Sequence, residues 1–262
     1  MSGLSLSQVS FERGNHRILQ DINLEVGKGQ LLGIIGPNGA GKSTLIKLLG
    51  GYHQPSLGQC TLDGNPLQNI KGEQRAKRIA YLPQSSQVEF PYSVSEVVSL
   101  GLQNSALSRS QKIKSINQYL AKLDIEHLAQ RQINSLSGGE QQLVHIARIL
   151  AQQTDIILLD EPCSSLDIGH EAQLMNLLHG YATRGKSIVV ALHNLNTAAE
   201  FCDKILLMDK GNVIAFGKPS EVLVEEHLHR LYPHNVAITY NPQTGNPNIL
   251  PIKSRRRTWM IQ

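Results

Sequence analysis

Alternating apolar and polar positions at the start of the chain predict a small antiparallel sheet. Residues 4–11 alternate as a half-buried strand does, and a turn at Gly14-Asn15 separates them from a second such run at residues 18–26. The glycines around position 28 mark the turn that ends this pair of strands.

Short apolar runs later in the chain predict strands, and the uninterrupted ones suit a parallel sheet buried on both faces. The predicted strands occupy residues 31–35, 60–64, 78–82, 156–159, 188–192 and 205–208. Apolar residues at helical spacing begin at Lys42 and return between residues 169 and 184. Strands alternating with helices are typical of a parallel α/β sheet covered by helices.

Helical spacing also extends from about Ser93 to Gln152, which predicts a mainly helical insertion. From Pro233 onward the chain contains several prolines and asparagines, and we expect this part to be rich in loops.

Composition places the chain among globular proteins and predicts no membrane span. Of its 262 residues, 40% are hydrophobic and 18% are charged, which is too apolar for a disordered chain. The net charge of +4 is too small to predict nucleic-acid binding by itself. No apolar stretch approaches the ~18 residues that cross a bilayer, and the first residues do not resemble a secretory signal. Cys60, Cys163 and Cys202 are far apart, so we expect reduced thiols rather than disulfides or a zinc site.

A glycine-rich segment after the first buried strand matches the phosphate-binding pattern GxxxxGK[ST]. It comprises Gly36, Pro37, Asn38, Gly39, Ala40, Gly41, Lys42 and Ser43, followed by Thr44. Glycines allow backbone N–H groups to converge on phosphate oxygens, and the start of the next helix favours the same anion. Lys42 is placed to reach the β- and γ-phosphates, and the Ser43 hydroxyl to bind Mg²⁺. The alternative is an ordinary glycine-rich turn, but the strand before it and the helix after it favour a nucleotide site.

Two acidic residues end the predicted strand at 156–159. Ligands of parallel α/β sheets lie at the carboxyl ends of the strands, which favours a metal-linked site beside the phosphates. Asp160 would hold Mg²⁺, and Glu161 would polarise the attacking water as a general base. The alternative is an acidic connection to the next helix, with Asp167 as its N-cap.

The segment Leu136-Ser137-Gly138-Gly139-Glu140-Gln141 precedes an amphipathic helix. A serine with two glycines at a helix start can present a hydroxyl and free N–H groups to an anion. By itself the segment favours an ordinary N-capped helix over an anion site.

Taken together, these motifs resemble the ATP-binding subunits of ABC transporters. Leu136 to Gln141 match the signature sequence of that family, and further segments follow in the expected order. Gln84 resembles the Q-loop glutamine, Ser165 and Asp167 belong to a segment like the D-loop, and His193 resembles the switch histidine. Phe11 stands at the place of the aromatic residue that stacks on adenine.

The resemblance implies a P-loop ATPase that works as a head-to-tail homodimer. ATP would lie between the phosphate loop of one copy and the signature of the other, namely Ser137, Gly138, Gly139, Glu140 and Gln141. It implies catalytic roles for Glu161, His193 and Gln84, with Mg²⁺ held by Ser43, Gln84 and Asp160. It also implies two permease subunits, a solute-binding protein acting through them, and a place on the cytoplasmic face of the inner membrane.

Several segments resemble importers of iron chelates in particular, namely residues 74–84, 90–98, 165–170, 192–196 and 241–245. This similarity implies import of haem or a ferric siderophore, with cobalamin as the alternative cargo. Cys163, Asn194 and Phe11 depart from the usual residues of the family. Asn194 removes a charge beside His193. Arg255, Arg256 and Arg257 could touch anionic lipid, or belong to a solvated tail.

The predicted organisation is an ABC ATPase domain at residues 1–225 and a C-terminal extension at 226–262. Within the domain, residues 1–85 and 153–225 would form a RecA-like core with a small antiparallel β subdomain, and 86–152 the helical insertion. Other functions considered are a soluble ABC ATPase in cluster assembly or nucleic-acid handling, and an ATP-binding regulator without turnover. We expect no nucleic-acid partner.

Overall fold

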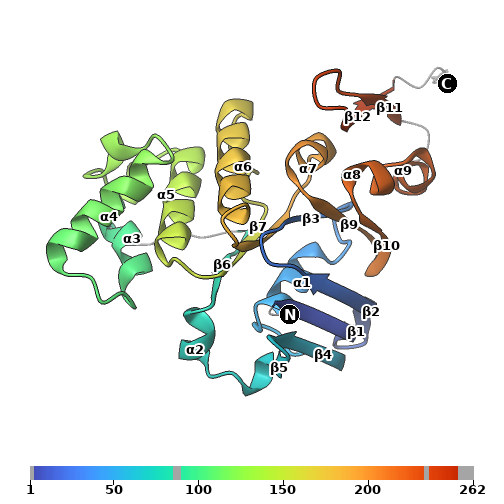
Figure 1. The fold of residues 1–262 in the computed structure, drawn as a ribbon, viewed down its shortest axis with the longest axis horizontal. Coiled ribbons are helices and arrows are strands. Elements are labelled where there is room, and N and C mark those ends of the chain that lie inside the picture. Colours follow the sequence, from blue (N-terminus) through green and yellow to red (C-terminus); the bar gives the residue numbers. More distant parts are fainter. Residues whose placement is uncertain (1–2, 85–89, 233–235, 253–262) are drawn as a thin grey trace, which may run out of the picture.

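A six-stranded, mainly parallel sheet forms the centre of the molecule (Figure 1). The computed structural model describes residues 3–84, 90–232 and 236–252. The sheet has the order β10-β9-β3-β8-β7-β6, in which β10 runs antiparallel to β9 and the other pairs are parallel. Its strands are β3 (Leu31–Ile35), β6 (Ile79–Leu82), β7 (Ile156–Asp160), β8 (Ser187–Ala191), β9 (Lys204–Asp209) and β10 (Asn212–Gly217).

A smaller antiparallel sheet lies beside it, with the order β2-β1-β4-β5. Its strands are β1 (Leu4–Arg13), β2 (His16–Val26), β4 (Leu57–Leu62) and β5 (Asn65–Pro66). The predicted hairpin at the start of the chain is therefore correct, and the strand expected at 60–64 begins earlier. The short helix α2 (Gly72–Ala76) leads from this sheet back to β6.

The two faces of the large sheet pack into two separate hydrophobic clusters. Alternate residues of β3, Leu32 and Ile34, pack with helix α1 (Lys42–Leu49) and the small sheet. Leu31 and Ile35, on the opposite face, pack with the remaining helices. Burial on both faces explains why β3 has no polar position, as the uninterrupted apolar run predicts.

Helices cover the second face and extend beyond the edge strand β6 (Figure 1). Between β6 and β7 lie α3 (Val94–Ser99), α4 (Arg109–Ala121) and α5 (Gly138–Ala151), joined by short 3₁₀ turns at residues 100–102, 126–128 and 133–135. Helix α6 (Ile168–Ala182) connects β7 to β8, and α7 (Leu195–Phe201) connects β8 to β9. None of the helices in the described ranges is both long and apolar enough to cross a lipid bilayer.

The C-terminal part is more regular than the sequence predicts. After β10 follow α8 (Pro219–Val222), α9 (Glu225–Leu231) and a hairpin of β11 (Val236–Tyr240) and β12 (Pro247–Pro251). The prediction that the chain is rich in loops from Pro233 onward was wrong for residues 236–240 and 247–251, which form this hairpin. Proline is tolerated at the ends of a two-stranded ribbon, where a missing N–H costs little, and Pro247 and Pro251 occupy the two ends of β12. Arg255, Arg256 and Arg257, which the sequence places either on anionic lipid or in a solvated tail, lie outside the described residues.

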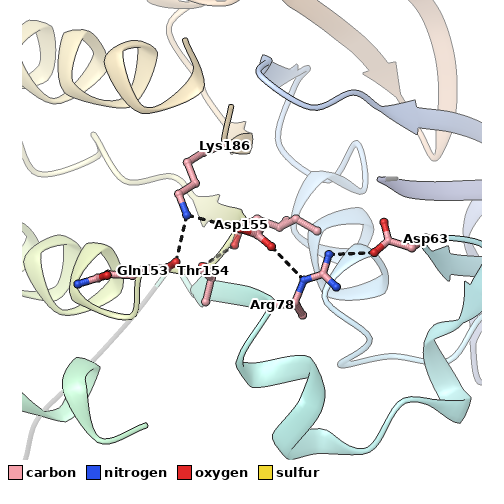
Figure 2. Close-up of polar contacts among 7 residues, drawn as sticks. Asp63, Arg78, Gln153, Thr154, Asp155 and Lys186 are labelled. Atoms are coloured by element: carbon pink, nitrogen blue, oxygen red, sulfur yellow. Dashed lines mark hydrogen bonds and ion pairs between the residues drawn. The ribbon is translucent and has the colours of Figure 1, made fainter. Parts of the chain in front are cut away.

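A polar network joins the amino ends of three adjacent strands of the large sheet, β6, β7 and β8 (Figure 2). Arg78, just before β6, bonds Asp155, just before β7, through Nε at 3.1 Å, and it reaches Asp63 after β4 through Nη2 at 2.9 Å. Lys186, just before β8, lies 3.6 Å from Asp155 and donates to the carbonyl of Gln153 at 3.0 Å. The network ties the small sheet to the large one at the sheet edge opposite the carboxyl ends.

Candidate active site

In the loop between β3 and α1, a Cβ at Gly36 or Gly41 would approach neighbouring atoms too closely. Gly36 has φ +150°, and a Cβ there would lie 2.2 Å from the carbonyl oxygen of Met208. Gly41 has φ +99° at the N-cap of α1, and its Cβ would lie 2.6 Å from Leu19. The left-handed backbone and the close packing explain the glycines of the motif.

Lys42, the first residue of α1, is buried and holds the loop from inside. Its ammonium donates to the carbonyl oxygens of Gly36 at 2.8 Å and Pro37 at 3.2 Å. Burial lowers the pKa of Lys42, while Glu161 and Asp160 act to raise it. These two hydrogen bonds go to neutral carbonyl oxygens, so an anion bound in the loop would supply a counter-charge bonded directly to the ammonium.

Ser43 and Asp160 join the start of α1 to the end of β7. Ser43 Oγ donates to Asp160 Oδ1 at 2.9 Å. Burial raises the pKa of Asp160, the Ser43 bond opposes this, and the neighbouring Glu161 adds to the rise. A hydroxyl and a carboxylate oxygen at this spacing form a donor set that suits a hard divalent cation such as Mg²⁺.

Glu161 is held between two other predicted catalytic residues. Its backbone is left-handed, with φ +54°, and its side chain is buried. Gln84 Nε2 donates to Glu161 Oε2 at 2.7 Å, and His193 Nε2 lies 2.5 Å from Glu161 Oε1. Because β6, β7 and β8 are adjacent and parallel, the residues that follow them meet at one edge of the sheet. A carboxylate held in this way can orient and deprotonate a water molecule.

Lys42, Ser43, Gln84 and Glu161 line a cavity of about 630 Å³, whereas Asp160 and His193 are not among its lining residues. The cavity is lined by Arg17, Ile18, Asn38, Gly39, Ala40, Gly41, Lys42, Ser43, Thr44, Gln84, Glu161 and Lys210. Sequence reasoning missed Arg17, Ile18 and Lys210, which belong to no motif and reach the cavity only through packing of β2 and of the β9–β10 turn.

Phe11 is not among the residues that line this cavity. Its ring stacks on His53, with centroids 5.1 Å apart and planes inclined by 9°. The prediction that Phe11 stacks on adenine gains no support from this placement.

The signature segment lines a different cavity, of about 640 Å³. Ser137 caps α5 in a reciprocal arrangement, in which Glu140 N donates to Ser137 Oγ and Ser137 N donates to the Glu140 carboxylate at 2.8 Å. The bonds from Ser137 lower the pKa of Glu140. Gly138, Gly139, Ser165 and Asp167 share this cavity. It has no lining residue in common with the cavity around Lys42.

The flanking residues take structural roles. Gln141 donates to the carbonyl of Leu136 at 3.1 Å, and Asp167 caps α6 by accepting from His170 N at 2.9 Å. Asn194 caps α7 through Asn196 N at 3.0 Å, so the residue after His193 starts a helix. Cys163 packs against the core, and burial raises its pKa to about 12, which keeps it a thiol.

A parallel sheet, a glycine loop with a buried lysine and a paired serine and aspartate define a P-loop nucleoside triphosphatase. Comparison with known proteins narrows this class. A sequence profile of the ABC transporter family matches residues 19–164. The chain therefore belongs to the ABC transporter family, and it is an ATPase of the kind that powers transport.

Curated relatives resemble nearly the whole chain. A hemin import ATP-binding protein HmuV of Pseudomonas entomophila is 41% identical over 252 residues, covering 94% of this chain and 99% of that protein. Its namesake from Thermobifida fusca is 38% identical and covers 95% of this chain and 89% of that protein. Among solved structures, a metal-chelate type ABC transporter in an inward-facing conformation has a TM-score of 0.79 at 30% identity, covering 96% of this chain and 98% of that one. A dimeric bacterial ABC transporter cassette has a TM-score of 0.75 at 30% identity, with 82% and 98% covered.

Proposed function

We propose that this ATPase powers import of an iron chelate, with haem as the cargo. The observation that carries the proposal is the near-full-length similarity to hemin import ATP-binding proteins from Pseudomonas and Thermobifida. The similarity to a metal-chelate type transporter over 96% of the chain supports the same cargo class. The family profile ends at residue 164, whereas a similarity over 96% of the chain must include most of the residues beyond that point.

In this proposal Glu161 is the general base for hydrolysis. The contacts from Gln84 and His193 support this role because they fix a carboxylate that lines the cavity. Lys42 and the N–H groups of the loop bind the β- and γ-phosphates. His193 orients Glu161 and the attacking water.

Mg²⁺ fits the oxygen atoms of Ser43, Asp160 and Gln84, and when bound it neutralises charge on the phosphates. Gln84 bonds Glu161 through its nitrogen, which leaves its oxygen available as a ligand. Asp160 and Ser43 bond each other in the structure and are therefore already close enough to share an ion.

The active unit in this proposal is a homodimer. A nucleotide at Lys42 in one chain would lie in a cavity that shares no lining residue with the signature cavity of that chain. A second copy, turned head to tail, would bring its Ser137, Gly138 and Gly139 to the γ-phosphate. A bound γ-phosphate would then hold the two copies together by charge-assisted hydrogen bonds, and hydrolysis would release them.

Transport also requires subunits that cross the membrane. We place the dimer on two permease subunits at the cytoplasmic face of the inner membrane. A solute-binding protein on the other side would deliver the chelate. The ATPase subunits themselves need not touch the cargo in this arrangement.

The direct test is transport by the reconstituted complex. The ATPase and its permease are placed in vesicles with ATP on the ATPase side, and uptake of haem, a ferric siderophore and cobalamin is measured separately. We expect ATP-dependent haem uptake that stops in the Glu161→Gln variant. Uptake of cobalamin or siderophore without haem would contradict the haem assignment, and the absence of any ATP-driven uptake would contradict the importer role.

A further inference from the structure

The cavity around Lys42 has two chemically different ends on opposite sides of the phosphate loop. In the sheet order, β3 lies between β9 on one side and β8, β7 and β6 on the other. Gln84 and Glu161 follow β6 and β7, whereas Lys210 lies in the turn after β9. The backbone bonds Gly211 N to Ala40 O at 3.1 Å and Gln20 N to Gly211 O at 2.9 Å fix this turn against the loop and β2.

The base of a bound nucleotide belongs at the end formed by β2 and the β9–β10 turn. With the γ-phosphate directed toward Glu161, the chain of phosphates crosses the loop and leaves the ribose and base on the far side. The residues that line that side are Arg17, Ile18 and Lys210.

None of the described residues lining this cavity is aromatic, so the flat surface for a purine must come from another group. A guanidinium is planar and stacks on aromatic faces, which an ammonium cannot do. Arg17 Nε donates to Glu12 Oε1 at 3.1 Å, and this bond orients the side chain on the hairpin. Ile18 adds an apolar surface beside it.

We propose that Arg17, together with Ile18, supports the adenine ring through the face of its guanidinium. The inference rests on the proposed ATP site around Lys42. Since stacking contacts the face of a base and every purine has such a face, Arg17 contributes to affinity for purine nucleotides without selecting adenine.

Variants at position 17 separate stacking from charge. We compare Arg17→Ala, Arg17→Lys, which keeps the charge but not the plane, and Arg17→Tyr, which restores a plane without the charge. Arg13→Ala is the matched control, since Arg13 lies on the same hairpin but does not line the cavity. Thermal unfolding of each variant confirms that it folds.

The measurement is the dissociation constant of AMPPNP, of GMPPNP, and of inorganic tripolyphosphate, which has phosphates but no base. We expect Arg17→Ala and Arg17→Lys to weaken AMPPNP binding about 5- to 30-fold. Arg17→Tyr should recover most of this loss and Arg13→Ala should bind normally. Tripolyphosphate should bind Arg17→Lys as it binds wild type, and wild type should bind AMPPNP and GMPPNP within about 5-fold of each other.

Several results would overturn the role of Arg17. Normal AMPPNP affinity in Arg17→Ala would do so, as would an equal loss of affinity for AMPPNP and tripolyphosphate in Arg17→Lys. Failure of Arg17→Tyr to recover AMPPNP affinity, or a loss of that affinity in Arg13→Ala instead, would do so too. If the wild type binds neither AMPPNP nor tripolyphosphate, the ATP site itself is refuted. If the wild type binds both but the position 17 variants behave in one of the ways just described, only the role of Arg17 is refuted.

Discussion

His193 Nε2 lies 2.5 Å from Glu161 Oε1, although 32 positions separate the two residues in the chain. The contact exists because β7 and β8 are neighbours in the sheet and both residues follow the ends of their strands. Gln84 completes the arrangement from β6.

Replacing Glu161 by glutamine should remove the base while keeping the shape of the site. We expect the turnover number for ATP to fall by about 10²- to 10⁴-fold, because an amide cannot accept the proton of the attacking water. The affinity for ATP should be retained. Phosphate release and equilibrium nucleotide binding measure the two effects. Glu73→Gln, at an exposed site that does not line the cavity, is the control, and wild-type turnover in Glu161→Gln would refute the base assignment.

Replacing Ser137 by arginine should prevent ATP-driven dimerisation without weakening ATP binding to one chain. Ser108 is a close control, since it caps α4 with the same reciprocal bonds that Ser137 makes on α5 but lines neither cavity. Both substitutions remove a cap, at a cost of about 0.5–2 kcal/mol. In a Glu161→Gln background with ATP, light scattering should report a dimer for Ser108→Arg and a monomer for Ser137→Arg. A dimer in both would contradict the role of the signature.

Replacing Asp160 by asparagine should stabilise the nucleotide-free protein near neutral pH. Burial raises the pKa of Asp160 above its ordinary value of 3.8, so folding disfavours the charged carboxylate. This destabilisation is complete above the folded-state pKa and disappears as the pH falls toward 3.8. We expect a Tm increase of about 2–4 °C at pH 7.5 that shrinks with acidification, together with a large loss of Mg²⁺-dependent turnover. If Asp160→Asn had a Tm below that of the wild type at pH 7.5, the destabilising effect of the buried Asp160 carboxylate would be refuted.

Replacing Arg78 by methionine should destabilise the fold but leave catalysis intact. The substitution removes both bonds that tie Asp63 and Asp155 together (Figure 2). We expect a loss of about 1–2 kcal/mol in the free energy of unfolding, measured by urea denaturation. Turnover should stay within about twofold of wild type, since the network is at the amino ends of the strands. Lys77→Met removes an exposed pair with Glu73 and should have little effect. If Arg78→Met and Lys77→Met changed the free energy of unfolding equally, the network around Arg78 would contribute no more to stability than one exposed ion pair.

Sequence motifs identify a site when its residues are local or follow strands in a regular way. The loop from Gly36 to Thr44 is a continuous segment, and its strand and helix could be recognised directly. Gln84, Glu161 and His193 could be named from their motifs, but their meeting depends on the order β8-β7-β6, which the sequence does not state.

Other features depend on irregular backbone or on packing between distant segments. The register of β1 shifts on both sides of Phe11, so counting alternate residues does not reveal which way its ring faces. Arg17 and Lys210 reach the cavity because β2 and the β9–β10 turn pack on the loop. The C-terminal hairpin is fixed by Glu200, which accepts from Thr244 at 2.9 Å, and by Asn196, which bonds the backbone of Ile249.

We expect two copies of this chain to hold two ATP molecules, each between Lys42 of one copy and Ser137 of the other. The most direct test is the structure of the ATP-loaded Glu161→Gln dimer. We expect Ser137 Oγ of each copy to lie within hydrogen-bond distance of the γ-phosphate bound by the other copy. A dimer in which the signature lies far from both nucleotides would contradict it.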